Sequence, residues 1–97
     1  MNGVSIVICC YNSADRIVDT LSFLKNQKVK IIYEVIIVDN NCSDNTIKKA
    51  TDYWSSCHIN LKIIKQPKSG LIYARELGLQ IASHDIIIFC DDDNWLE

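Results

Sequence analysis

Runs of apolar residues alternate along the chain with segments in which apolar residues recur every three or four positions. Val4 to Cys10 is a continuous, largely apolar segment rich in β-branched residues, which is typical of a strand buried on both faces. Residues 34–39 (EVIIVD), 61–64 and 85–90 (DIIIFC) have the same character. The pattern therefore predicts four buried strands.

Three amphipathic segments separate these strands and predict helices. Polar residues suited to the N-cap precede the first two, at Asn12 or Ser13 and at Ser43 or Asp44. Their apolar positions have helical spacing and should face the sheet. These positions are Ile17, Val18, Leu21 and Leu24 in a helix over about residues 14–26, Ile47, Ala50 and Trp54 in the second helix, and Ala74, Leu77, Gly78 and Ile81 in a third that begins at Leu71.

The predicted order is βαβαβαβ, which implies an α/β fold. Buried strands that alternate with helices form a Rossmann-like parallel sheet flanked by helices on both faces. In open sheets of this kind, ligands bind beyond the carboxyl ends of the strands, where the strand order reverses. The residues expected at that edge are Tyr11 and Asn12, Asp39 to Asn41, the turn 67–70, and Asp91 to Asn94.

Length, charge and cysteine content narrow the class of protein. Ninety-seven residues make one domain, residues 1–97, and a net charge of −2 gives no electrostatic case for nucleic acid as a partner. The longest apolar run, Ile6 to Tyr11, is far shorter than the ~20 residues that cross a bilayer. Five cysteines without a C-x-x-C pair fit a reducing compartment, so we expect a cytoplasmic protein.

The acidic triplet Asp91, Asp92 and Asp93 directly follows the last predicted strand. Carboxylates about 5.5 Å apart repel each other by about 3 kcal/mol per pair at an effective dielectric constant of about 20. A divalent cation would compensate this repulsion, and Mg²⁺ and Mn²⁺ prefer such hard oxygen ligands together with phosphate oxygens. The alternative is a solvated acidic turn that caps the next element.

Other polar residues at the same edge allow both a functional and a structural interpretation. Tyr11 could stack on a nucleobase or pack on the sheet edge, and Asp39 could bind a ribose or base edge or only form a turn. Arg75, on the third helix, could reach back to a base or phosphate or remain a surface residue. Asn41 and Asn45 stand where a turn needs a positive φ, which Asn tolerates.

Four segments in order resemble the inverting nucleotide-sugar glycosyltransferases of family 2, which have the A-type fold. VSIVICCYN resembles the opening strand of the family, and EVIIVDNNCSDNT resembles its V-D-D-G-S-x-D-G-T segment. SGLIYARELGLQIA resembles its G-x-x-x-A-R-x-x-G helix, and IIIFCDDDNWL resembles its strand that ends in the D-x-D metal motif. Cys9 and Cys10 replace the usual Pro-Thr, and Asn40 and Asn41 replace Asp-Gly.

The resemblance implies a donor site for a nucleotide-sugar, with UDP-sugars expected, and a divalent cation, Mn²⁺ or Mg²⁺. The cation would stabilise the departing nucleoside diphosphate. The implied roles are base stacking for Tyr11, base or ribose binding for Asp39, base contact for Arg75, a backbone contribution from Cys9, ribose or metal contacts for Asp91 and Asp92, and the bridge between metal and diphosphate for Asp93.

The resemblance also implies what lies outside these 97 residues. Family members carry an acceptor-binding half with an Asp or Glu general base well downstream of the D-x-D motif, and Glu97 is too close to that motif to match it. We therefore expect the donor-binding half of an enzyme, truncated after the fourth strand and inactive alone. The intact enzyme would transfer sugar to a saccharide or lipid-linked saccharide, in cell-surface polysaccharide or glycolipid synthesis, in the cytoplasm or peripherally at the inner membrane face.

Two other interpretations remain at this point. The chain could be a non-enzymatic nucleotide-binding or interaction module that forms homo-oligomers by pairing the exposed edge of its fourth strand. It could also be a phosphotransfer or nuclease domain that uses Asp39 and Asp91 to Asp93 with two metal ions.

Overall fold

The computed structural model describes residues 3–25, 32–55 and 59–91 of the chain. Within these ranges strands and helices alternate in the predicted order, which confirms the βαβαβαβ fold. The strands are β1 (Gly3–Cys10), β2 (Ile32–Asp39), β3 (Asn60–Lys65) and β4 (Ile86–Asp91). The helices are α1 (Ile17–Lys25), α2 (Thr46–Trp54) and α3 (Leu71–Ile81).

The four strands form one parallel sheet in the order β3-β2-β1-β4. Successive strands lead from β1 through β2 to β3, and the chain then crosses back to place β4 on the other side of β1. The strand order therefore reverses between β1 and β4, and ligands of open parallel sheets bind outside the carboxyl ends of strands at such a point.

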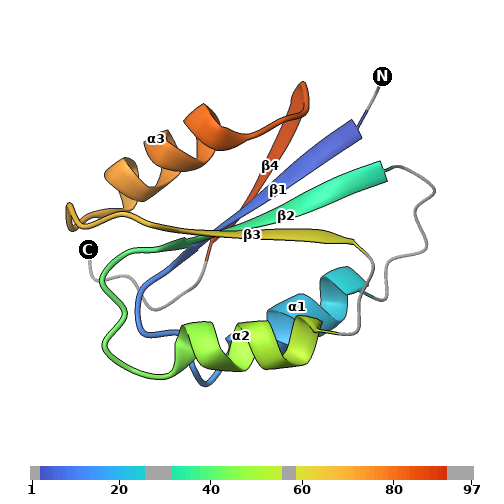
Figure 1. Ribbon diagram of the computed structural model, residues 1–97. Helices are drawn as coiled ribbons and strands as arrows, with labels where there is room; N and C mark the ends of the chain where they lie inside the picture. Colours follow the sequence, from blue (N-terminus) through green and yellow to red (C-terminus); the bar gives the residue numbers. More distant parts are fainter. Residues whose placement is uncertain (1–2, 26–31, 56–58, 92–97) are drawn as a thin grey trace.

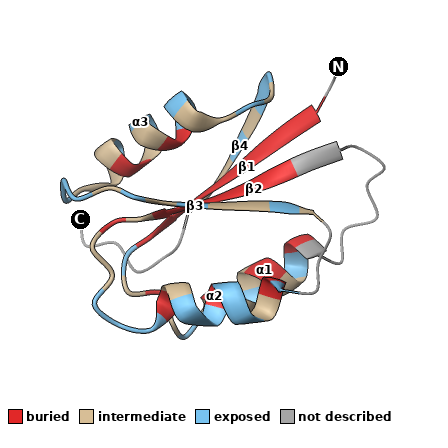
Figure 2. Cartoon of the chain, viewed as in Figure 1, coloured by how far each residue is buried: buried red, intermediate tan, exposed pale blue. Residues whose placement is uncertain are grey.

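Helices cover both faces of the sheet, α1 and α2 on one face and α3 on the other (Figure 1). Because side chains alternate along a strand, Ile6 and Ile8 of β1 pack with the α1 and α2 side, and Val7 and Cys9 pack with the α3 side. All residues of β1 are buried, as Figure 2 shows in red. The predicted inward positions of all three helices are confirmed, since each belongs to one of these two cores or is buried.

Strand β4 departs from the expectation of burial on both faces. Ile86 and Ile88 are 53% and 47% exposed, although their sequence reads like that of β1. The register places them beside Val4 and Ile6, on the face of α1 and α2. Within the described ranges β4 pairs with β1 alone, so it forms an edge of this sheet. Pairing of this edge between two copies of the chain stays a prediction.

Helix α3 lies unusually close to the sheet at Gly78. A Cβ at this position would overlap Cγ1 of Val7, in the centre of β1. Gly78 therefore allows the helix to approach the sheet closely. The distance between helix and sheet in turn sets how far the side chains of α3 lie from the strands.

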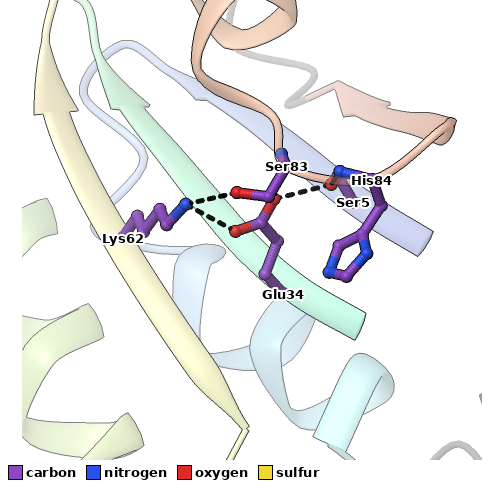
Figure 3. Close-up of polar contacts among 5 residues, drawn as sticks. All are labelled: Ser5, Glu34, Lys62, Ser83 and His84. Carbon is purple, nitrogen blue, oxygen red and sulfur yellow. Dashed lines mark hydrogen bonds and ion pairs between the residues drawn. The ribbon is translucent and has the colours of Figure 1, made fainter. Parts of the chain in front are cut away.

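A polar cluster around the buried side chains of Ser5 and Glu34 holds the chain where it leaves α3 (Figure 3). The carboxylate of Glu34 is almost fully buried and accepts hydrogen bonds from the Ser5 hydroxyl (2.7 Å) and the Ser83 backbone N–H (2.6 Å). Lys62 Nζ forms an ion pair with the other carboxylate oxygen (2.8 Å) and donates to the Ser83 hydroxyl (2.8 Å). The backbone N–H of His84 donates to the Ser5 hydroxyl (3.2 Å).

This cluster stabilises the ionised form of Glu34. Burial by itself raises the pKa of Glu34, but the contacts from Lys62, Ser5 and Ser83 outweigh it and lower the pKa to about 2. The charged cluster ties three strands to the end of α3, at the amino-terminal half of the sheet and away from the carboxyl ends of the strands.

The described residues contain no helix with both the length and the apolar character that crossing a membrane requires.

We expect Gly78→Ala to destabilise the chain, because the added methyl group meets Val7. In an exposed helix the same change is stabilising by about 1 kcal/mol, whereas overpacking costs about 1–3 kcal/mol, so the two effects differ in sign. Urea unfolding measures the difference, and Gln80→Ala, at an exposed position two residues along, is the matched control. A more stable Gly78→Ala variant would contradict the close approach of α3 to the sheet.

Glu34 should make stability fall at acid pH. Its pKa is lowered from 4.5 to about 2, so its carboxylate stabilises the fold above pH 4.5 and loses this effect as the pH falls toward 2. The full shift corresponds to about 3 kcal/mol. Urea unfolding at pH 7, 4.5 and 3 should show a shallower loss for Glu34→Gln than for the wild type, and the exposed Glu76→Gln should behave as the wild type does. Equal slopes for all three proteins would show that Glu34 is not stabilised as an anion.

Candidate functional site

The carboxyl ends of the strands bring the predicted site residues to one edge of the sheet. Cys10 ends β1 beside Asp39, which ends β2, and Asp91 ends β4 beside Cys9. With neighbouring strands about 4.8 Å apart, the ends of β2 and β4 lie about 10 Å from each other across β1. The expected convergence of these strand ends is confirmed for the backbone.

Cys9 and Tyr11 lie at the end of β1, next to the point where the strand order reverses. Cys9 is fully buried on the α3 side, and burial raises the pKa of its thiol to about 11, although the charge of Arg75 lowers it in part. The thiol is therefore neutral at physiological pH and is not a nucleophile. Tyr11 follows the strand and is 36% exposed, so part of its ring is accessible at the edge of the sheet.

Asp39 is oriented by the loop that follows it. One oxygen of its carboxylate accepts a hydrogen bond from the Cys42 backbone N–H (2.9 Å), and its carbonyl oxygen accepts one from Gln66 N–H (2.9 Å). Burial above all, together with the nearby carboxylate of Asp39, raises the pKa of Cys42 to about 11, although hydrogen bonds from Asn12 and Thr46 lower it in part. The neutral thiol of Cys42 in turn donates to the Cys10 carbonyl oxygen (3.5 Å) and accepts from Asn12 N–H (3.3 Å).

The loops after β1 and β2 brace each other, because a side chain of each loop accepts hydrogen bonds from the backbone of the other. The side-chain oxygen of Asn12 accepts from the backbone N–H groups of Ser43 (2.7 Å) and Asp44 (3.3 Å). The carboxylate of Asp44 accepts hydrogen bonds from Ala14 N–H (3.1 Å) in the first loop and from both the backbone N–H and the hydroxyl of Thr46, the first residue of α2. These contacts lower the pKa of Asp44 against the opposing effect of burial, so its charge supports the brace.

The bracing corrects part of the capping prediction. The N-cap of α2 is Asn45, without a side-chain capping bond, so the predicted cap at Ser43 or Asp44 is wrong. Asp44, one residue earlier, instead accepts a hydrogen bond from the backbone N–H of Thr46, the first residue of α2. The Ser13 hydroxyl is buried without a hydrogen-bond partner among the described residues, so Ser13 is not a side-chain cap, and α1 begins at Ile17 rather than near residue 14. Asn12 supports the neighbouring loop instead.

Positive φ angles occur at Asn12 (51°) and Asn41 (63°). The prediction for Asn41 is confirmed, and the prediction for Asn45 is wrong, because Asn45 has a φ of −93° at the N-cap of α2. At residue 12 the chain turns sharply out of β1 within two residues, and the bonds of the Asn12 side chain to the next loop stabilise this conformation.

Asn40 and Asn41 connect the end of β2 to the turn before α3. The side-chain amide of Asn41 donates to the Pro67 carbonyl oxygen (2.8 Å) and to the Ser69 hydroxyl (2.9 Å). The amide of the buried Asn40 makes three further bonds to the same turn, including one with Gly70. This turn therefore lies at the carboxyl edge, as the sequence predicts.

Arg75 extends the site from the α3 side. Its guanidinium group lies 5.7 Å from the centroid of the Phe89 ring in β4, and its charge acts on Cys9 in β1. Arg75 is therefore close to both strands that flank the reversal of strand order. In the preceding turn, Lys68 Nζ lies 4.1 Å from the centroid of the Tyr73 ring, which adds a second positive charge near this edge.

Most of the acidic triplet, where the metal ligands are expected, lies outside the residues that the structure describes. Asp92 and Asp93 lie outside the described residues, and Asp91 is described by its backbone alone. Among the described residues no three His, Cys, Asp or Glu side chains are grouped so that they could hold a metal ion. The positions of the three aspartates as metal ligands stay a prediction, and the carboxylates suit a hard cation by their chemistry.

The sequence did not reveal the contacts of Asn12, Asn40 and Asp44, which join the loops at this edge. A signal was present, because small polar residues gather after β1 and β2, and Asn40 and Asn41 stand where the family pattern has Asp and Gly. This signal did not identify the hydrogen-bond partners, because each of these bonds joins residues at least 26 positions apart in the sequence.

A parallel sheet that carries helices on both faces and whose strand order reverses between β1 and β4 belongs to the class of open α/β folds that bind ligands at the carboxyl ends of their strands. The chain belongs to glycosyl transferase family 2, whose model matches residues 5–97.

Relatives and solved structures agree with this assignment. The chain is 35% identical over 95 residues to chondroitin synthase of Escherichia coli, and the match covers 96% of this chain and 14% of the synthase. It matches the structure of S. aureus TarS 1–349 in complex with UDP with a TM-score of 0.83 and 28% identity, over 94% of this chain and 27% of that one.

A third similarity concerns the fold alone. The mannosyltransferase PcManGT from Pyrobaculum calidifontis, solved with GDP-Man and Mn²⁺, matches with a TM-score of 0.76 at 24% identity, over 91% of this chain and 26% of that one. The chain thus has the A-type fold of these glycosyltransferases and spans between a seventh and a third of the length of the first curated relatives it matches.

Proposed function

We propose that this chain binds the nucleotide-sugar donor of a glycosyltransferase that transfers a sugar, from a UDP-sugar, to an acceptor hydroxyl group. The observation that carries the proposal is the meeting of the ends of β1, β2 and β4 and of Arg75 at the point where the strand order reverses. TarS, whose structure matches 94% of this chain in fold, has been solved with UDP. Synthesis of cell-surface polysaccharide or glycolipid is the process that we infer, because the relatives include a chondroitin synthase.

The residues of this edge suit the parts of a nucleotide. Tyr11 offers a partly exposed ring for stacking on the base, an interaction of about 1–3 kcal/mol per base where measured in nucleic-acid binding. Asp39, held by the Cys42 N–H, offers an oriented acceptor for a base or ribose. Cys9 contributes through its backbone because its side chain is buried, and Arg75 supplies positive charge beside the same two strands.

The acidic triplet would hold a divalent cation, Mn²⁺ or Mg²⁺, between protein and diphosphate. We assign Asp93 and Asp91 as metal ligands and Asp92 to ribose contact, and β4 ends at Asp91 on the edge of the sheet where β2 ends at Asp39. When bound, the cation stabilises negative charge on the departing nucleoside diphosphate. The hard carboxylate oxygens fit either ion.

The acceptor, the general base and the location of the intact enzyme are further parts of the proposal. We place the general base and the site for a saccharide or lipid-linked saccharide in the portion of the relatives that this chain does not match, and we expect the 97 residues alone to bind donor without transferring sugar. We place the enzyme in the cytoplasm or peripherally at the inner membrane face. The free cysteines among the described residues, of which Cys9 and Cys10 are buried, agree with a reducing compartment. The family assignment supports neither a phosphotransfer or nuclease domain nor a non-enzymatic binding module.

Isothermal titration of the purified chain with UDP, with and without Mn²⁺, tests the proposal. We expect binding that Mn²⁺ strengthens, and a loss of about tenfold or more for Asp93→Ala in the presence of Mn²⁺ only. The matched control is Asp85→Ala, at an exposed aspartate before the opposite end of β4, which should bind as the wild type does. The proposed function fails if the wild type does not bind UDP, and the metal assignment fails if Mn²⁺ or Asp93 has no effect.

A further inference from the structure

The side chain of Asn40 is buried directly after β2 and uses its full amide. It is 1% exposed. Its Nδ2 donates to the carbonyl oxygens of Gln66 and Lys68, both at 2.8 Å, and its Oδ1 accepts from the backbone N–H of Gly70 at 2.9 Å. Its backbone N–H donates to the carbonyl oxygen of Cys10 (2.9 Å), so the residue is itself anchored to the end of β1.

The three amide bonds determine where α3 begins. Gly70 is the N-cap of α3, has a φ of 133°, and accepts the first helical hydrogen bond from Ala74 N–H (3.2 Å). The N-cap has no side-chain capping bond of its own, and Gln66 Nε2 adds a bond to the Tyr73 carbonyl oxygen (3.2 Å) in the first helical turn. The start of the helix is therefore held from the β2 side, chiefly by Asn40.

Arg75 lies one residue beyond the first helical hydrogen bond. Its guanidinium group is next to Phe89 of β4 and close enough to lower the pKa of Cys9 in β1. A displacement of the start of α3 would move this guanidinium relative to the ends of both strands. Position 40 is thus mechanically connected to the positive charge of the site, although Asn40 is buried beneath the turn.

We propose that Asn40 is a positioning residue that places Arg75 for the diphosphate-bearing nucleotide, a role that rests on the proposed function. Position 40, where the family pattern has Asp, is surrounded in this chain by groups that suit an amide. Two of the groups around it are carbonyl oxygens that require donors, and the third is an N–H that requires an acceptor. A carboxylate would face both carbonyl oxygens with lone pairs, and only its protonated form can donate to one of them.

Asn40→Asp tests this role without removing bulk. In the nucleotide-free protein the Nε–Hε NMR resonance of Arg75 reports its place beside the Phe89 ring. We expect this resonance to shift in Asn40→Asp at pH 8 and to return toward the wild-type position as the pH is lowered and the new carboxyl group protonates. Asn45→Asp, the same change at an exposed asparagine, is the control and should leave the resonance in place at every pH.

The affinity for UDP with Mn²⁺ separates positioning from a general structural effect. We expect Asn40→Asp to weaken binding by about tenfold at pH 8 relative to the wild type at the same pH, and to weaken it by less than about threefold when Arg75 is already alanine. An equal factor in both backgrounds would show that Asn40 acts on the fold rather than through Arg75. Thermal unfolding of each variant confirms that the compared proteins are folded.

The outcomes distinguish this inference from the proposed function. If the wild type binds UDP but the Arg75 resonance ignores Asn40→Asp, the positioning role is overturned and the function stands. If the resonance follows Asn40→Asp but the wild type does not bind UDP, the role of placing Arg75 stands and its purpose in nucleotide binding is overturned. Should Asn40→Asp not fold, Asn40→Ser, which keeps one hydroxyl donor and acceptor, is carried through the same cycle with Arg75→Ala.

Discussion

Strand β2 holds helix α3 at both ends through two buried polar side chains. Glu34, near the start of the strand, binds the backbone N–H of Ser83 after the helix, and Asn40, just beyond its end, binds the N–H of Gly70 before it. A buried polar group without its partner costs about 1–3 kcal/mol, so other placements of the helix are disfavoured. Gly78 then allows α3 to approach the sheet closely between these two points. The helix is thereby fixed above the centre of the sheet.

The opposite face of the site is organised by the mutual bracing of the loops after β1 and β2. Asn12 and Asp44 each satisfy backbone N–H groups of the other loop, so the residues around the end of β1 form one unit with those after β2. With α3 held independently from β2, the carboxyl edge combines two pre-arranged parts. Pre-organisation of this kind lowers the entropic cost of ordering loops when a ligand binds.

Two departures from the family pattern acquire a physical meaning in the structure. Cys9 and Cys10 are fully buried and have the role of small apolar side chains, one on each face of the sheet. The side-chain amides of Asn40 and Asn41 donate hydrogen bonds to carbonyl oxygens of the turn before α3. The Asp and Gly of the family pattern have no side-chain N–H and could not make these bonds. The glycosyl transferase family 2 fold is therefore kept here with its own set of contacts at the strand ends.

The sequence by itself determined the elements, their order and the edge where polar residues meet, because periodicity is local and parallel strands all end at one edge. It placed Tyr11 and Asp39 correctly on that edge for this reason. Only the tertiary structure decided the strand order and the partners of Glu34 and Asn40, since their bonds join residues 26 to 49 positions apart. It also decided that the apolar β4 is exposed on one face, because burial depends on a strand's place in the sheet and not on its composition.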